Sequence, residues 1–306
     1  MRRRTLIVLL VVTLAGCAGP TAIGLPPAGD RHHGQYLLTA VPFFPQQAYQ
    51  CGPAALAMAL SWSGVPITPQ ELVPEVFTPS KKGSLQPAVV AAARRHDRIA
   101  YLLTDPRSLS DEISAGHPVV VLQNLGLSWY PVWHFAVVVG LDFTDGAVIM
   151  HSGTTPRKRT SFKTFAYTWS RSDYWGLLVM PPWQLPAVAT EGHVLRSVGH
   201  LERLGKWQAA AEGYRAALRR WPDSLIATVG LGVCLYRSGD LVAAEAHFRD
   251  ATFRFPHEGV VYNNLAHVLM EMGKNAEAAE AALKAVDIGG PLKADYERTL
   301  EEIQMR

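Results

Sequence analysis

A 34-residue period runs through the C-terminal third of the sequence, and it constrains the fold more than any other feature. Gly205, Gly239 and Gly273 follow one another at this step. The same step separates the members of three further sets: Pro222 and Pro256; Ala210, Ala244 and Ala278; and Ala217, Ala251 and Ala285. Such a period means that one supersecondary unit is repeated and that each unit buries its apolar face against the next. Residues 190–306 are therefore predicted to stack into an elongated, all-helical domain.

The details of the period resemble the tetratricopeptide repeat, in which each unit is a pair of antiparallel helices. The large position of the unit holds Tyr214, then Phe248, then Ala282, between the small residues that let helices approach closely. The resemblance implies three repeats, a polar-faced capping helix over residues 292–304, and a protein partner bound by the repeat domain. Cys234 falls inside the first helix of the second unit, where we expect a buried structural cysteine.

The first residues have the pattern of an export signal. Three arginines precede an apolar run from Leu6 to Leu14, which is far shorter than the roughly 20 residues of a membrane span. The small residues before Cys17 resemble a bacterial lipoprotein signal, which implies removal of residues 1–16 and a lipid on Cys17. An ordinary cleaved signal with a coincidental cysteine is the alternative.

Residues 17–35, rich in Gly, Pro and Ala, are expected to form the tether. Because Ala18 rather than aspartate follows the cysteine, we expect an outer-membrane anchor facing the periplasm.

Charge excludes one class of partner. The chain has 29 basic and 26 acidic residues, and the signal carries three of the arginines and no acid, which leaves 26 against 26. A neutral chain gives no reason to expect nucleic-acid binding. Residues 157–159, Arg-Lys-Arg, are expected to be a solvated loop, and the histidines show no metal-ligand spacing, so we predict no metal and no cofactor.

Residues 36–185 combine helical and extended patterns. Helices are expected at 53–62 and 85–97, and strands at 117–125, 133–142, 146–153 and 174–182. A hairpin should join the second strand to the third, because Asp145-Gly146 is a hairpin signal. Helices followed by a meander of strands imply an α+β domain with an antiparallel sheet. Residues 188–195 are expected to be the linker to the repeats.

Cys51 is placed where a nucleophile would be useful, at the junction of a loop and an apolar helix. A free thiol has a pKa of about 8.5, which a helix N-terminus or a neighbouring imidazolium lowers. Gly52 and Pro53 suit a tight entry into a helix, so backbone N–H groups are expected to stabilise the thiolate and later an oxyanion. His134, at the start of an apolar strand, is the best candidate for the imidazole.

The stretch "VPFFPQQAYQCGPAALAMAL" at 41–60, with "WHFAVVVGLD" at 133–142 and a hairpin after it, resembles the papain-like family-39 cysteine peptidases. These include the enzymes that cleave bacteriocin precursors after a double-glycine leader. The resemblance implies that Cys51 is the nucleophile and that His134 is the general base and acid. Gln46 would supply the side chain of the oxyanion hole, with Gln47 as the alternative.

The sequence departs from this family at the third catalytic position, where the family carries Asp or Asn. Ser152 or its neighbour His151 stands there instead, so the enzyme is expected to be slow. Two other functions stay open, a non-catalytic scaffold that keeps the peptidase fold and a Cys-dependent acyl or amide transferase. The tryptophans of this domain are expected to serve packing rather than a substrate groove.

Overall fold

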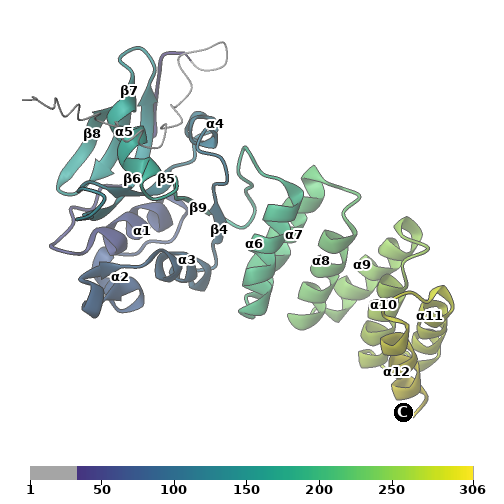
Figure 1. Cartoon of the computed structure of the whole chain (residues 1–306). Helices are drawn as coiled ribbons and strands as arrows, with labels where there is room; N and C mark the ends of the chain where they lie inside the picture. Colours follow the sequence, from purple (N-terminus) through teal and green to yellow (C-terminus); the bar gives the residue numbers. More distant parts are fainter. Residues whose placement is uncertain (1–32, 306) are drawn as a thin grey trace, which may run out of the picture.

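The computed structural model describes residues 33–305, which form an α+β part followed by an all-helical part (Figure 1). The predicted export signal, Cys17 and most of the tether lie outside the described residues. Within the described range, no helix is both long enough and apolar enough to cross a membrane.

The α+β part is built on one antiparallel sheet with the strand order β4-β9-β5-β6-β7-β8, and β1 pairs with the far end of β6. The strands of this sheet are β1 (Gln35–Leu37), β4 (Ile99–Leu102), β5 (Val119–Asn124), β6 (Trp133–Asp142), β7 (Ala147–Ser152), β8 (Thr155–Ser161) and β9 (Gly176–Met180). Two short strands, β2 (Phe77–Thr78) and β3 (Gly83–Ser84), pair with each other apart from it.

Helices cover both faces of this sheet. They are α1 (Cys51–Trp62), α2 (Pro69–Val76), α3 (Gln86–Arg95), α4 (Ser108–Ser114) and α5 (Phe162–Ser170), with the short 3-10 helix η1 (Pro79–Lys81) after β2. Phe135, Val137 and Val139 of β6 pack with the apolar side chains of α1 and α3, whereas Ala136 and Val138 pack with those of α4 and α5 on the opposite face. Because both faces are covered, β6 reads as a continuous apolar run rather than an alternating one.

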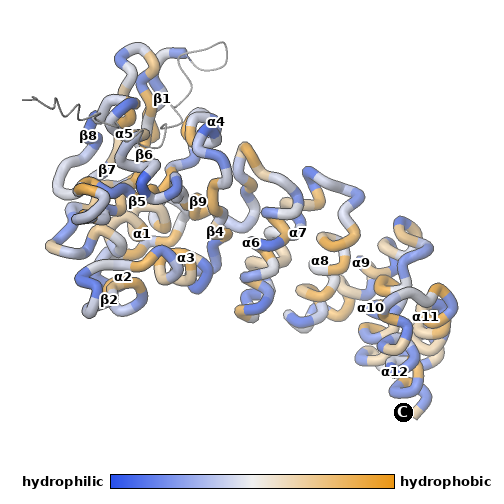
Figure 2. Tube along the Cα trace, viewed as in Figure 1, coloured by the Kyte–Doolittle hydropathy of each residue, from blue (hydrophilic) through white to orange (hydrophobic). Residues whose placement is uncertain are grey.

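The helix α1 lies at the centre of this half of the core. Its residues from Gly52 to Leu60 are all buried, and Figure 2 shows it apolar along its length. A helix that is hydrophobic all round must be enclosed on every side. This helix is held by the sheet, by α2 and α3, and by β3, so the residue at its N-terminus has a fixed position.

Three helix pairs and a final helix make up the second part over the described residues. The pairs are α6 (Glu191–Arg203) with α7 (Trp207–Arg220), α8 (Leu225–Arg237) with α9 (Leu241–Arg254), and α10 (Gly259–Glu271) with α11 (Asn275–Ile288); α12 (Lys293–Gln304) follows them. The aromatic ring of Phe248 packs where a Cβ on Gly232 would meet it at 2.3 Å. The sequence prediction of an α+β domain followed by an all-helical repeat region is therefore confirmed.

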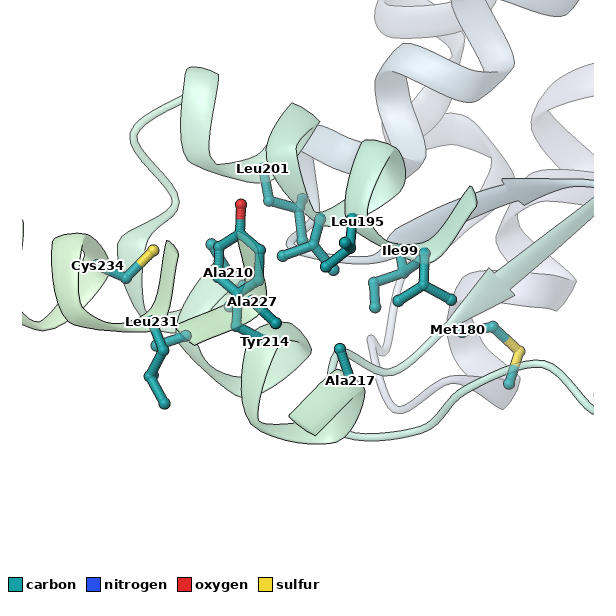
Figure 3. Packing of buried hydrophobic residues seen from close by; sticks show 14 of the residues in the cluster. Ile99, Met180, Leu195, Leu201, Ala210, Tyr214, Ala217, Ala227, Leu231 and Cys234 are labelled. Atoms are coloured by element: carbon teal, nitrogen blue, oxygen red, sulfur yellow. The ribbon is translucent and has the colours of Figure 1, made fainter. Parts of the chain in front are cut away.

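The two parts share a continuous apolar core. Helix α6 packs on the edge strand β4, where Ile99 and Met180 lie against Leu195 (Figure 3). An ion pair of 2.8 Å between Lys206 and Asp97 borders the contact. Since an exposed sheet edge is open to unwanted pairing, the first repeat also protects this edge.

Every strand and helix predicted for residues 36–185 is present, with ends shifted by at most two residues. The elements without a sequence prediction are β1, β2, β3, β4, β8, α2, α4 and α5, which are short or, in β8, exposed on nearly every residue. The predicted linker at 188–195 was wrong. Thr190 precedes α6, whose buried residues Val194 and Leu195 belong to the shared core, and the connection between the two parts is residues 181–190.

Candidate active site

Cys51 is the first residue of α1 and is half-buried at the end of the sheet. Gln50 precedes it as the N-cap and makes no side-chain capping hydrogen bond, so the first N–H groups of the helix are free of a side-chain cap. The sulfur accepts from the backbone N–H groups of Phe135, Gly52 and Cys51 itself. The contact with Phe135 brings the thiol next to β6 at the residue that follows His134.

The tight entry into α1 depends on the missing side chain of Gly52. A Cβ there would lie 2.2 Å from Ser84 Oγ of β3 and 3.8 Å from the ring of Phe135. The Ser84 hydroxyl is buried and has no hydrogen-bond partner among the described residues. Nothing in the sequence pointed to Ser84, because a two-residue strand far from Cys51 along the chain carries no periodic signal.

His134 and Ser152 lie together on neighbouring strands. The ring atom Nε2 of His134 is 2.9 Å from Ser152 Oγ, which leaves Nδ1 for another partner. Ser152 ends β7 and is buried. His151 faces the other way, with its Nε2 3.3 Å from the Val41 carbonyl and its Nδ1 accepting from the Arg157 N–H. The strand alternation thus puts Ser152, and not His151, beside the His134 ring.

Electrostatics favour the neutral forms of both groups. Burial raises the pKa of the Cys51 thiol above its ordinary value, and the three backbone N–H groups offset this only in part. Burial, helped by the positive charge of Lys158, lowers the pKa of His134 to about 4. The backbone N–H groups at the start of α1 do lower the thiol pKa, as expected, but desolvation outweighs them and the net pKa is raised.

Gln46 lies near the third catalytic position. Its backbone N–H donates to the Gly153 carbonyl at 3.2 Å, in the turn that follows Ser152. Gln46 is half-buried, whereas Gln47 is exposed. Tyr49, between this segment and Cys51, has a φ of 64°, which is unusual for a residue with a side chain.

Two expectations about the surroundings of the site were wrong. Trp169 is buried, but Trp129 and Trp133 are 79% and 50% exposed, because the segment before β6 turns their side chains away from the core. Residues 157–159 belong to β8 rather than to a loop. The side chain of Lys158 from this strand influences the His134 imidazole.

The described residues contain no group of three or more His, Cys, Asp or Glu that could hold a metal ion. Cys51 and Cys234 are both free, and Cys234 is fully buried, which raises its pKa to about 12. Thiol chemistry with an external partner is therefore open to Cys51 and closed to Cys234.

The fold and the candidate site define a class of protein. Its members have an α+β domain with Cys, His and Ser near the end of the sheet, followed by helical repeats. Residues 38–175 match the Peptidase_C39 like family, and residues 200–258 match the tetratricopeptide repeat. Two stretches of the chain thus resemble known families, the first the C39-like peptidases and the second the tetratricopeptide repeats.

The solved structures that resemble this chain fall into the same two groups. A C39-like peptidase from Bacillus anthracis is 17% identical, with a TM-score of 0.42 over 48% of this chain and 97% of that one. The peptidase domain of Streptococcus ComA, a bi-functional ABC transporter, is 20% identical, with a TM-score of 0.37 over 49% and 99%. The Yersinia enterocolitica type III secretion translocator chaperone SycD is 20% identical, with a TM-score of 0.36 over 38% and 92%.

One curated protein is also similar to this chain. Stress-induced-phosphoprotein 1 of Caenorhabditis elegans is 36% identical over 74 residues, which is 24% of this chain and 23% of that protein. The chain thus spans under a quarter of the length of that relative.

Proposed function

We propose that the protein is a thiol peptidase that hydrolyses peptide bonds through Cys51 and His134. The observation that carries the proposal is the contact of the Cys51 sulfur with the backbone of β6 directly after His134, whose Nε2 is held by Ser152. The repeats serve as the part that binds a partner or presents a substrate.

The proposed reaction starts from the neutral pair. His134 takes the thiol proton as the sulfur attacks the carbonyl carbon of the substrate. The oxyanion that forms accepts hydrogen bonds from the N–H groups at the start of α1 and from the side chain of Gln46. The C–N bond then breaks, and His134 gives the proton to the leaving amine. Water attacks the thioester with His134 again as base, the C–S bond breaks, and the proton returns to the sulfur.

The test uses the chain with Cys234→Ala, so that Cys51 is its only described thiol. A peptidyl acyloxymethyl ketone should label Cys51, and a mixture of short unstructured peptides should be hydrolysed. Cys51→Ala should abolish both reactions, and His134→Ala should slow hydrolysis on the order of 10²- to 10⁴-fold, as for loss of a general base. If the ketone leaves Cys51 unlabelled and no peptide is cut, the proposal is wrong.

The raised thiol pKa and the serine in place of a carboxylate favour a second candidate, a scaffold that keeps the peptidase fold without its chemistry. In a scaffold, labelling of Cys51 would not depend on the imidazole. Equal labelling rates with and without His134→Ala would therefore support the scaffold and exclude the peptidase.

We also propose that a lipid on Cys17 anchors the protein to the outer membrane, facing the periplasm, as the lipoprotein-like signal suggests. A single acyl chain binds a membrane only marginally, so stable anchoring requires more than one chain. We predict that the full chain expressed with its signal sediments with membranes and that Cys17→Ser releases it into the soluble fraction. A Cys17→Ser protein that still sediments with membranes would contradict the lipid anchor.

A further inference from the structure

Exposed apolar side chains gather around the candidate active site. Eleven large apolar residues are exposed before residue 185 in the described chain. Two of them are Tyr49 and Leu85, and six lie in residues 125–133: Leu125, Leu127, Trp129, Tyr130, Val132 and Trp133. We call these eight residues the rim patch. Their exposed fractions run from 47% to 79%, which is unusual for large apolar side chains that serve no contact.

Three separate segments bring the rim patch to one place. Tyr49 stands two residues before Cys51, and residues 125–133 run directly into His134. Leu85 follows Ser84, whose hydroxyl oxygen lies 2.2 Å from the point that a Cβ on Gly52 would occupy. The rim patch therefore borders the half-buried thiol from the side of α1 and from the side of β6.

The loop between β5 and β6 is ordered by its own hydrogen bonds, although its side chains face solvent. Asn124 Oδ1 accepts from the N–H groups of Gly126 and Val132 at 3.0 and 2.9 Å. Leu127 and Tyr130 exchange two backbone hydrogen bonds of 3.1 Å, and Arg171, directly after α5, donates to the Gly126 carbonyl. A fixed loop that displays Trp129 is pre-organised for binding, which reduces the entropy lost when a partner binds.

The charged side chains in the segments 79–86 and 153–159 are all cations. Residues 42–50 and 125–133 contain no charged side chain, residues 79–86 contain Lys81 and Lys82, and residues 153–159 contain three cations. Arg159 is paired with Asp142 and Asp145, whereas Lys158 influences His134. A partner that carries positive charge would be repelled here, and one with acidic residues would be attracted.

We propose that the rim patch is the substrate-recognition surface of this site and that it binds an extended peptide with bulky apolar side chains and acidic neighbours. This inference rests on the proposed peptidase function, since it names the substrate class for the same site. A peptide is the occupant because the rim patch lies on two sides of a recessed thiol, so that a chain passing between them reaches Cys51. Trp129 and Trp133 are then specificity-determining residues.

The test measures binding without turnover. Three fluorescein-labelled decapeptides are titrated into the full chain with Cys51→Ala, and fluorescence anisotropy gives the Kd. The first has Leu, Phe and Trp at its centre and Glu at both ends, the second has Ser in place of the apolar residues, and the third has Lys in place of Glu. The first peptide should bind at least about tenfold more tightly than either of the others, which corresponds to 1.4 kcal/mol.

Substitutions at matched exposed tryptophans locate the binding surface. Trp129→Ala in the Cys51→Ala chain should weaken the first peptide about fivefold or more and leave the circular dichroism spectrum unchanged. Trp183→Ala removes another exposed tryptophan side chain, 54% against 79% for Trp129, from the connection to the repeats, and should leave the Kd unchanged. Equal affinity for the three peptides, or equal effects of the two substitutions, overturns the proposal.

Vesicles of anionic phospholipid provide the competing outcome. If the rim patch is a membrane contact instead, the vesicles will bind the Cys51→Ala chain, Trp129→Ala will abolish that binding, and the three peptides will bind alike. That result also overturns the inference while leaving the peptidase proposal intact. The opposite result is also possible. If the Cys51→Ala chain binds the first peptide selectively but the ketone does not label Cys51 in the chain that keeps it, the recognition surface is supported and the peptidase proposal is wrong.

Discussion

The proposed pair of Cys51 and His134 differs from a pre-formed thiolate–imidazolium pair in where the proton rests. Both groups are largely desolvated, so the uncharged thiol and the uncharged imidazole are the stable forms. Because burial lowers its pKa to about 4, His134 is mostly neutral at neutral pH. In the proposed mechanism the neutral imidazole would act as a base at neutral pH, and the thiol would lose its proton only when the substrate arrives.

The pH dependence of alkylation tests this assignment at the residue scale. In the Cys234→Ala chain, the rate of Cys51 alkylation by iodoacetamide should rise steadily from neutral pH to beyond pH 9, because the thiolate forms only above the raised thiol pKa. In a pre-formed ion pair the thiol pKa would be low, and the alkylation rate would be constant at every pH above that lowered pKa. A plateau between pH 5 and 8 would contradict the neutral pair.

Substitutions of Ser152 test its role beside the imidazole. Ser152→Ala removes the hydrogen bond to Nε2 and should lower peptide hydrolysis about tenfold, or 1.4 kcal/mol. Ser152→Asp adds a negative charge and should raise the pKa of His134, which nuclear magnetic resonance titration would measure. His151→Ala is the matched control, since His151 faces Val41. If His151→Ala abolished hydrolysis and Ser152→Ala did not change it, His151 and not Ser152 would occupy the third catalytic position.

Glycines within the repeat helices decide how closely these elements approach. Gly230 lies against the ring of Tyr214, and Gly232 against the ring of Phe248. The aromatic residue of one unit thus packs on a glycine of the neighbouring helix. The period alone predicted the helices, but it did not identify which glycines these rings require.

We predict opposite effects for two glycine-to-alanine changes inside helices. Gly232→Ala places a Cβ 2.3 Å from the buried ring of Phe248, and should cost about 1–3 kcal/mol of unfolding free energy through overpacking. Gly199→Ala in α6 meets nothing nearer than 3.7 Å, so better helix propensity should stabilise by up to about 1 kcal/mol. Urea denaturation of the full chain measures both, and two changes of the same sign would contradict the packing argument.

At the scale of the whole molecule, one buried carboxylate fixes the connection between the two parts. Glu112 of α4 is fully buried and accepts from the N–H groups of Ala187 and Val188 at 3.2 and 3.0 Å. It also binds His117 Nδ1 at 2.6 Å, and the other ring nitrogen of His117 accepts from Gln184. This cluster and the core shared by β4 and α6 make the repeats a rigid extension of the peptidase-like domain.

We predict that Glu112→Ala destabilises the full chain by about 3 kcal/mol, because it leaves the N–H groups of Ala187 and Val188 and the buried His117 ring without their acceptor. Thermal denaturation should then show a Tm lowered by several degrees. Asp105→Ala is the control, because Asp105 forms an exposed ion pair with Arg107 that is worth at most about 1 kcal/mol. Equal Tm values for the two variants would show that the cluster does not hold the connection.

The sequence by itself determined the order of the parts, the repeat period and the candidate residues Cys51 and His134, because periodicity and helix entry are local properties of the chain. Only the tertiary structure decided the protonation of that pair, since burial depends on what packs around it. The same holds for Ser152 over His151 as the neighbour of His134, which strand alternation and pairing fix. Ser84, Glu112 and the rim patch depend on segments far apart in the chain, and contacts of that kind leave no local pattern to read.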